Sequence, residues 1–93
     1  MKTIYKYPIQ IEDRQTLRLP RGAQILAIQE QYREPQLWAL VDNEAPHEDR
    51  IICCFGTGHS VSVEGGELKF ISTVQFGGGT LVFHFFENVN SEF

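Results

Sequence analysis

The sequence predicts an all-β fold, a small antiparallel sandwich or barrel of about seven short strands. Apolar and polar side chains alternate along most segments, which is the two-residue period of a strand. Glycine, proline and acidic clusters interrupt these segments about every ten residues, as turns do. The connections are short, which favours antiparallel neighbours. With 93 residues, the chain is expected to form a single β domain over residues 1–93.

The first third of the chain predicts three strands. Residues 3–11 alternate, with Tyr5 and Tyr7 on one face, and Pro8 lacks a backbone donor. This strand is therefore expected at a sheet edge, or to be broken at Pro8. Residues 15–19 form the second predicted strand. Residues 23–31 contain good helix formers, but the segment is short and has no N-cap, so we predict a strand.

The middle of the chain predicts a central strand, a surface loop and a fifth strand. Arg33-Glu34-Pro35 has the composition of a hairpin turn, and residues 36–42 are apolar on both faces, which is typical of a central strand. Residues 43–49 are polar and acidic and are expected to form a surface loop, before a fifth strand over residues 50–55.

Two longer strands are predicted near the end. Residues 68–76 place Phe70 and Val74 on one face, and residues 80–87 alternate Phe83 and Phe85 against Phe86. Three glycines separate them. Residues 61–63 are a candidate for a short extra strand.

Composition excludes several function classes. The net charge is −4 and the eight basic residues are scattered, so nucleic-acid binding is not expected. No apolar run reaches transmembrane length, and the first residues lack the apolar core of a signal peptide. Cys53 and Cys54 are neighbours that point to opposite faces of a strand, so they are poorly placed to bridge. These features predict a protein of the reducing cytoplasm.

One glycine-rich turn is a candidate ligand site. Two glycines can turn successive N–H groups into a concavity that binds anions, and the hydroxyl and imidazole side chains would add donors. The alternative is a tight turn that needs glycine for its backbone alone. The motif lacks the Gly-Lys-Ser/Thr ending of a Walker sequence. The candidate residues are Gly56, Thr57, Gly58, His59 and Ser60.

No catalytic residue, metal site or cofactor is predicted. His47, His59 and His84 have no short ligand spacing, and a zinc site needs three or four converging ligands. Cys54 lies in an apolar run, where a buried thiol is inert. His84 is expected to be a hydrogen-bonded structural residue. The chain is therefore not expected to be an enzyme.

Aromatic residues exceed what one small core needs. Tyr5, Trp38 and Phe86 are candidates for an interface with a second copy or with another protein, because aromatic side chains are enriched there. The alternative is a second packed face within the domain. An edge strand at Pro8 would also permit strand addition between copies.

Several motifs resemble small proteins encoded by bacteriophages and prophages. The residues that carry the resemblance span nearly the whole chain. They are Lys2-Thr3-Ile4-Tyr5-Lys6-Tyr7-Pro8, Leu19-Pro20-Arg21-Gly22-Ala23 with Ile25-Leu26, Leu37-Trp38-Ala39-Leu40-Val41-Asp42, Gly56-Thr57-Gly58-His59 and Val82-Phe83-His84-Phe85-Phe86-Glu87. The resemblance implies phage origin and action in the cytoplasm of an infected host, and it brings no activity.

The sequence thus favours a non-enzymatic module that binds a host protein or itself as a homo-oligomer. The alternative is a binder of a small anionic ligand, such as a nucleotide, at residues 56–60.

Overall fold

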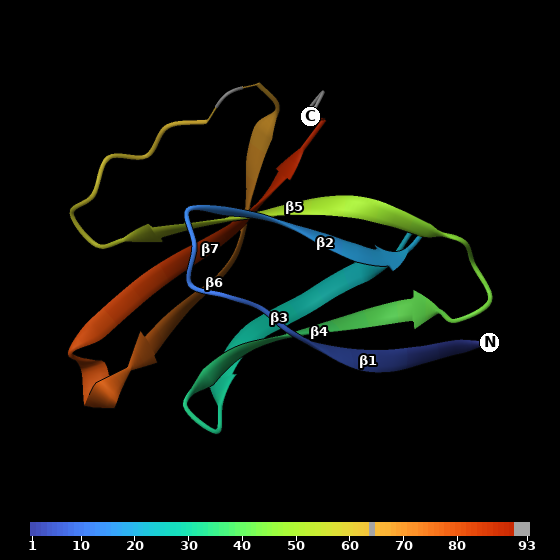
Figure 1. The fold of residues 1–93 in the computed structure, drawn as a ribbon, viewed down its shortest axis with the longest axis horizontal. Helices are drawn as coiled ribbons and strands as arrows, with labels where there is room; N and C mark the ends of the chain where they lie inside the picture. Colours follow the sequence, from blue (N-terminus) through green and yellow to red (C-terminus); the bar gives the residue numbers. More distant parts are fainter. Residues whose placement is uncertain (64, 91–93) are drawn as a thin grey trace.

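The fold is a sandwich of two antiparallel sheets, as predicted (Figure 1). The computed structural model describes residues 1–63 and 65–90. One sheet has the strand order β1-β4-β3 and the other the order β2-β5-β7-β6, so the described residues contain seven strands. The strands are β1 (Lys2–Pro8), β2 (Arg14–Pro20), β3 (Gln24–Gln31), β4 (Glu34–Asp42), β5 (His47–Gly56), β6 (Glu67–Phe76) and β7 (Leu81–Val89), with a 3-10 turn, η1 (Gly77–Gly79), between the last two.

The core lies between the two sheets and is built by alternate side chains of each strand. Leu37, Ile52 and Phe85 are among its fully buried members. Burying a large apolar side chain contributes about 1.5–3 kcal/mol to stability, so this layer is the main source of cohesion. The two-residue period places Phe86 on the opposite face of the same sheet, outside the core.

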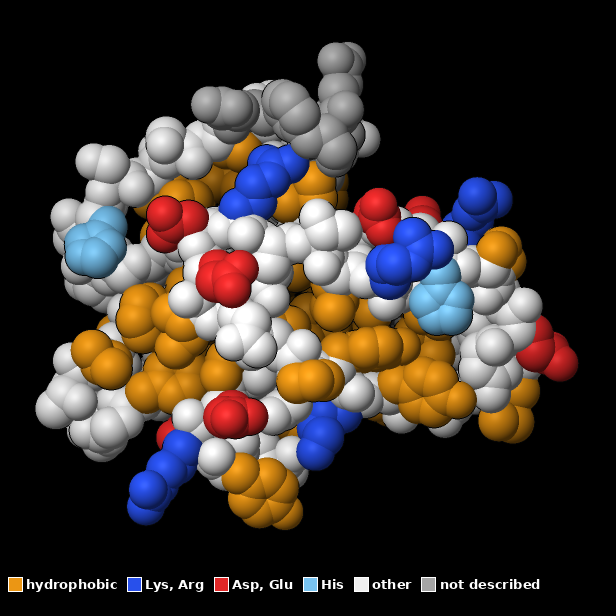
Figure 2. All heavy atoms as spheres, viewed as in Figure 1, with side chains coloured by type: hydrophobic (Ala, Val, Ile, Leu, Met, Phe, Trp, Pro, Cys, Tyr) orange, Lys and Arg blue, Asp and Glu red, His pale blue; other side chains and the backbone are white. Residues whose placement is uncertain are grey.

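The two open sides of the sandwich differ. On one side β3 lies beside β6, and the N–H of Ile28 donates to Ser72 Oγ at 3.0 Å. The other side has the edge strands β1 and β2, which the connection 9–13 joins (Figure 1). Figure 2 shows hydrophobic side chains in a band across the middle of the molecule in this view, with charged side chains above and below. No helix in residues 1–63 and 65–90 has the length and apolarity to cross a membrane.

The prediction that Pro8 marks an edge strand is confirmed, although the strand is shorter than expected. β1 ends at Pro8 rather than at residue 11. Within residues 1–63 and 65–90 its one sheet neighbour is β4, and the N–H of Ile9 donates to the Pro35 carbonyl at 3.2 Å where the pairing ends. Because proline has no N–H, it fits a position whose backbone faces away from the neighbouring strand.

Two predicted turns were wrong in position. The β3–β4 hairpin turns at Tyr32 and Arg33, which have φ of 54° and 68°, and Pro35 already belongs to β4. Two positive φ values are typical of the two-residue type I′ turn, whose twist matches the flanking strands. The predicted loop 43–49 is also shorter, because β5 begins at His47 and pairs there with Pro20 of β2.

A β-bulge corrects the predicted faces of β6. The register with β7 shifts between Phe70 and Ser72, so Val74 is buried in the core while Phe70 lies on the outer face, 57% exposed. An extra residue in one strand reverses which side chains face inward. Residues 61–63 do not form the predicted extra strand.

Candidate functional site

Two backbone donors of the glycine-rich turn at the end of β5 are already bonded within the fold. The N–H of His59 donates to the Gly56 carbonyl at 3.1 Å, and the N–H of Thr57 donates to the Val82 carbonyl at 3.4 Å. An anion nest needs such N–H groups to be free. A Cβ on Gly56 would lie 2.9 Å from the exposed His59 ring, which could shift, whereas Gly58 has φ of 85°, a left-handed conformation that favours glycine.

The cavities around this turn do not favour an anion. His59 lies between a cavity of ≈ 260 Å³, which Asp13 also lines, and a cavity of ≈ 250 Å³. None of the described lining residues is Lys or Arg, and a carboxylate faces the larger space. Nucleotide binding at residues 56–60 stays a prediction, and the geometry of the turn gives it no support.

His84 is held by two hydroxyl groups on the outer face of the four-stranded sheet. Its Nε2 lies 2.7 Å from Thr57 Oγ1 and its Nδ1 lies 2.9 Å from Thr73 Oγ1. Both ring nitrogens therefore have partners, as expected for a structural histidine. A metal ligand needs a ring nitrogen that is available to the ion.

The two cysteines are unsuited to nucleophilic chemistry. Both are free and buried, on opposite faces of β5. Burial raises the pKa of the Cys54 thiol to about 11, with a smaller contribution from Asp13, and burial also raises the pKa of Cys53. A nucleophilic cysteine needs a lowered pKa. The described residues also contain no cluster of three or more His, Cys, Asp or Glu suited to a metal ion.

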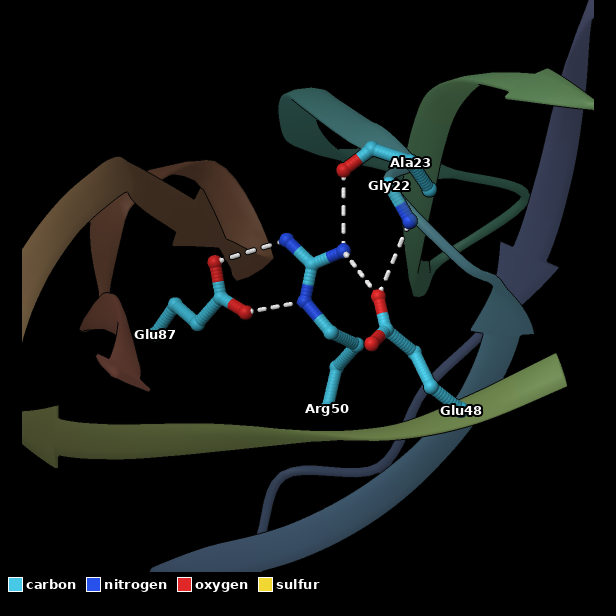
Figure 3. A network of polar contacts seen from close by, with 5 residues as sticks. All are labelled: Gly22, Ala23, Glu48, Arg50 and Glu87. Carbon is cyan, nitrogen blue, oxygen red and sulfur yellow. Dashed lines mark hydrogen bonds and ion pairs between the residues drawn. The ribbon is translucent and has the colours of Figure 1, made fainter. Parts of the chain in front are cut away.

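An ion-pair network, which the sequence did not predict, links β5, β7 and the β2–β3 turn (Figure 3). The Arg50 guanidinium donates through Nε and Nη2 to both carboxylate oxygens of Glu87, the second at 3.0 Å, and through Nη1 to the Ala23 carbonyl at 2.8 Å. The N–H of Gly22 donates to the Glu48 carboxylate at 3.0 Å, and this carboxylate lies 3.6 Å from Arg50 Nη1.

This network is structural in character. The hydrogen bonds to Glu87 raise the pKa of Arg50 above its ordinary value, so the guanidinium stays charged. It ties the β2–β3 turn at Gly22 and Ala23 to the centre of the four-stranded sheet. The signal in the sequence is weak: Arg50 and Glu87 occupy core-facing positions of two predicted strands, 37 residues apart.

The three predicted interface residues lie on three different surfaces. Tyr5 is opposite Ala39, which is buried, so it projects on the core side of the edge strand β1. Trp38 is adjacent to Ala39 and therefore faces outward on the three-stranded sheet. Phe86 lies on the outer face of the four-stranded sheet. The fold does not bring these three side chains into one interface.

Phe86 instead joins two phenylalanines that the sequence did not single out as a group. Its ring packs edge-to-face against Phe55 of β5 and Phe70 of β6, with ring centroids 5.9 and 5.5 Å apart. We call Phe55, Phe70 and Phe86 the Phe face. Phe70 is the most exposed of the three, and Cys53 lies below them, buried. Edge-to-face pairs add about 0.5–1.5 kcal/mol beyond area burial, so the rings hold one another in place.

Comparison with known proteins gives a family and no activity. The model of a family described as a domain of unknown function (DUF7352) matches residues 1–92. The chain belongs to this family. No curated protein and no solved structure matches the chain significantly. Phage origin and a cytoplasmic location therefore stay predictions from the sequence.

Proposed function

We propose that this chain is a non-enzymatic protein-binding module and that the Phe face is its recognition surface. The observation that carries the proposal is the cluster of three rings, packed edge-to-face on an outer sheet surface, with Phe70 57% exposed. A ring that is so exposed contributes little burial energy to the folding of the domain. Its apolar surface becomes stabilising when a partner removes it from water.

The composition of this surface suits a protein partner. The cross-strand neighbours of Phe86 are Cys53 and Phe70. The centre of the Phe face is therefore apolar and free of charge. Arg18 and Asp49 pair at 2.9 Å further along the same face. An apolar centre with aromatic anchors and a charged margin is the usual anatomy of a protein–protein interface.

The two cysteines support a binding role over catalysis. Burial raises the pKa values of Cys53 and Cys54, which disfavours a nucleophilic thiolate. The proposal includes action in the cytoplasm of an infected host, which rests only on the resemblance to phage proteins.

Site-specific photo-crosslinking in cells tests the Phe face. Benzoylphenylalanine replaces Phe70 in one variant and Leu81 in the control, because Leu81 is also apolar and 54% exposed but outside the Phe face. We expect one discrete protein adduct from position 70, absent from position 81 and lost when Phe86→Ala is added. An equal set of adducts from both positions, or none from position 70, contradicts the proposal.

A further inference from the structure

At the free edge of β1, the backbone N–H and C=O groups of every second residue point away from the sheet. The Met1 carbonyl accepts from the N–H of Asn43 and the Pro35 carbonyl accepts from the N–H of Ile9, which fixes the odd-numbered residues as those bonded to β4. In an antiparallel pair these bonds fall on alternate residues. The backbone groups of Lys2, Ile4, Lys6 and Pro8 therefore point away from the sheet.

The same strand exposes apolar side chains on both of its faces. Ile4 is 57% exposed on the outer face, and Tyr5 is 44% exposed on the core side, where its ring lies edge-to-face with Tyr7 at 6.4 Å. Unpaired backbone groups beside exposed apolar side chains are what strand addition requires, because the added strand supplies hydrogen bonds and covers the side chains together.

We propose that a second copy of this chain adds to β1, antiparallel across a two-fold axis, to form one continuous sheet with three strands from each copy. The axis passes between Tyr5 and its counterpart. This register pairs the whole of residues 2–8, with Lys2 opposite Pro8, Thr3 opposite Tyr7 and Ile4 opposite Lys6. A two-fold contact uses one surface twice, so it closes as a dimer.

Charge selects this register over its neighbours. With the axis at Ile4, Lys2 would lie opposite Lys6, and with the axis at Lys6, that lysine would lie opposite itself. Like charges directly opposite one another destabilise a strand pair. The axis at Tyr5 avoids both contacts and places the two exposed tyrosines in a non-hydrogen-bonded pair, where side chains approach most closely.

Lysine side chains ordinarily protect a strand edge, but Lys6, one of the two lysines of β1, is turned away from the free edge. Lys6 Nζ donates to Gln31 Oε1 at 2.6 Å and lies 5.9 Å from the centre of the Tyr32 ring, so its ammonium group is drawn across the sheet toward the β3–β4 turn. The free edge near Ile4 is left to backbone groups and apolar side chains.

The dimer goes beyond the proposed function and does not depend on it. The Phe face belongs to the four-stranded sheet, whereas β1 belongs to the three-stranded sheet. A dimer through β1 would present two Phe faces to a partner, which raises avidity where the partner offers two sites.

Removal of one backbone N–H at the free edge tests the interface. Ile4→Pro removes an N–H that points away from β4, and Ile4→Thr keeps this N–H with another β-branched side chain. By light scattering after gel filtration, over a concentration series, we expect the wild type and Ile4→Thr to have the mass of two chains and Ile4→Pro the mass of one. A monomeric wild type overturns the dimer, and it leaves crosslinking at Phe70 unaffected.

Disulfide trapping tests the register and does not rely on the proline variant folding. Paired residues in a non-hydrogen-bonded position lie about 4.5 Å apart at Cα, within the range of a disulfide. Under air oxidation we expect Tyr5→Cys to form a covalent dimer and Ile4→Cys to remain mostly uncrosslinked. The native cysteines are buried and serve as the internal control in the wild type. Crosslinking of Ile4→Cys without Tyr5→Cys overturns the register.

Discussion

The two edge strands β1 and β2 have nearly the same sequence pattern and different surroundings. Each has seven residues, with a basic residue first and fifth, a β-branched residue third and proline last, from Lys2 to Pro8 and from Arg14 to Pro20. In β2, as in β1, the bonds that flank the pairing direct the alternate residues, Thr16 among them, toward the free edge. The shared pattern therefore encodes an edge strand with proline at its end.

What differs is how each strand meets the core. The sixth of the seven residues is Leu19 in β2, which is fully buried, and Tyr7 in β1, which is half-buried. The exposed side chains of β2 are polar, whereas β1 exposes Ile4 and Tyr5. A sequence pattern can thus assign an edge, but the neighbouring layers decide whether that edge keeps apolar surface for a partner.

The largest effect should come from the matched core positions. Leu19→Ala removes a fully buried side chain and is expected to lower the free energy of unfolding by roughly 2–5 kcal/mol. Tyr7→Ala should cost less, because Tyr7 is only half-buried. Urea denaturation followed by Trp38 fluorescence measures both. Equal losses would mean that β1 and β2 contribute alike to the core.

Proline substitution should separate the two sides of each edge strand. The register directs the N–H groups of Tyr5 and Leu17 to β4 and β5, so Tyr5→Pro and Leu17→Pro each remove a ladder hydrogen bond and should lower the free energy of unfolding by roughly 1–3 kcal/mol. Ile4→Pro and Thr16→Pro remove N–H groups that face outward and should cost distinctly less when measured at low protein concentration.

The matched pair also checks the alternation itself. If Ile4→Pro destabilised the dilute protein as much as Tyr5→Pro, the Ile4 N–H would be bonded within the chain. The free edge assigned to β1 would then be wrong. Circular dichroism establishes that each variant keeps its strand content before the comparison is made.

The far end of β2 is anchored by a part-buried ion pair, whereas the ion pairs at the start of β1, from Met1 to Asp42 and Glu44, are exposed. Glu87→Gln keeps the side-chain volume but removes the charge that faces Arg50, and a hydrogen bond to a charged group contributes roughly 1.5–3 kcal/mol. We expect a loss of this size, with faster amide exchange at Gly22 and Ala23 and unchanged exchange in β1. Equal acceleration in both strands would assign the network a global role.

The succession of strands along the chain could be predicted, whereas their order within each sheet could not, and the exceptions have local causes. Alternation and turn residues predicted seven strands, the edge at Pro8 and the central position of residues 36–42. The turn at Tyr32 and Arg33 was missed because neither residue is the glycine or asparagine that usually signals positive φ.

The candidate site was harder to predict than the fold. One extra residue near Phe70 turns that ring outward, and alternation alone gives no sign of a bulge. The Phe face follows from the register among β5, β6 and β7, which no single segment encodes. The Gly56–Ser60 turn contains one glycine that its backbone needs, Gly58 with φ of 85°, and two of its N–H groups are bonded within the fold.

The smallest effect, on thiol reactivity, should report how often β2 opens. Cys53 lies opposite Arg14 of β2, and the Cys54 N–H donates to the Asp13 carbonyl at 3.2 Å just before that strand begins. With a pKa of about 11 for Cys54, only about one molecule in a thousand carries its thiolate at pH 8. Labelling by iodoacetamide should therefore be slow in the closed form. Because it goes through a form with β2 open, whose thiol has the ordinary pKa, its rate should rise about tenfold per pH unit and level off at about pH 8.5.

The rate of cysteine labelling also distinguishes β1 from β2 when one substitution is made in each strand. Gln15 holds the start of β2, because its side chain accepts from the Gln10 N–H at 3.0 Å and donates to the Gln10 carbonyl at 2.7 Å. Gln15→Ala should loosen β2 and speed labelling several-fold, whereas Ile4→Thr on β1 should leave the rate unchanged. Equal acceleration by both variants would show that the cysteines are reached through global unfolding, and the contrast between the two edges would not extend to their local opening.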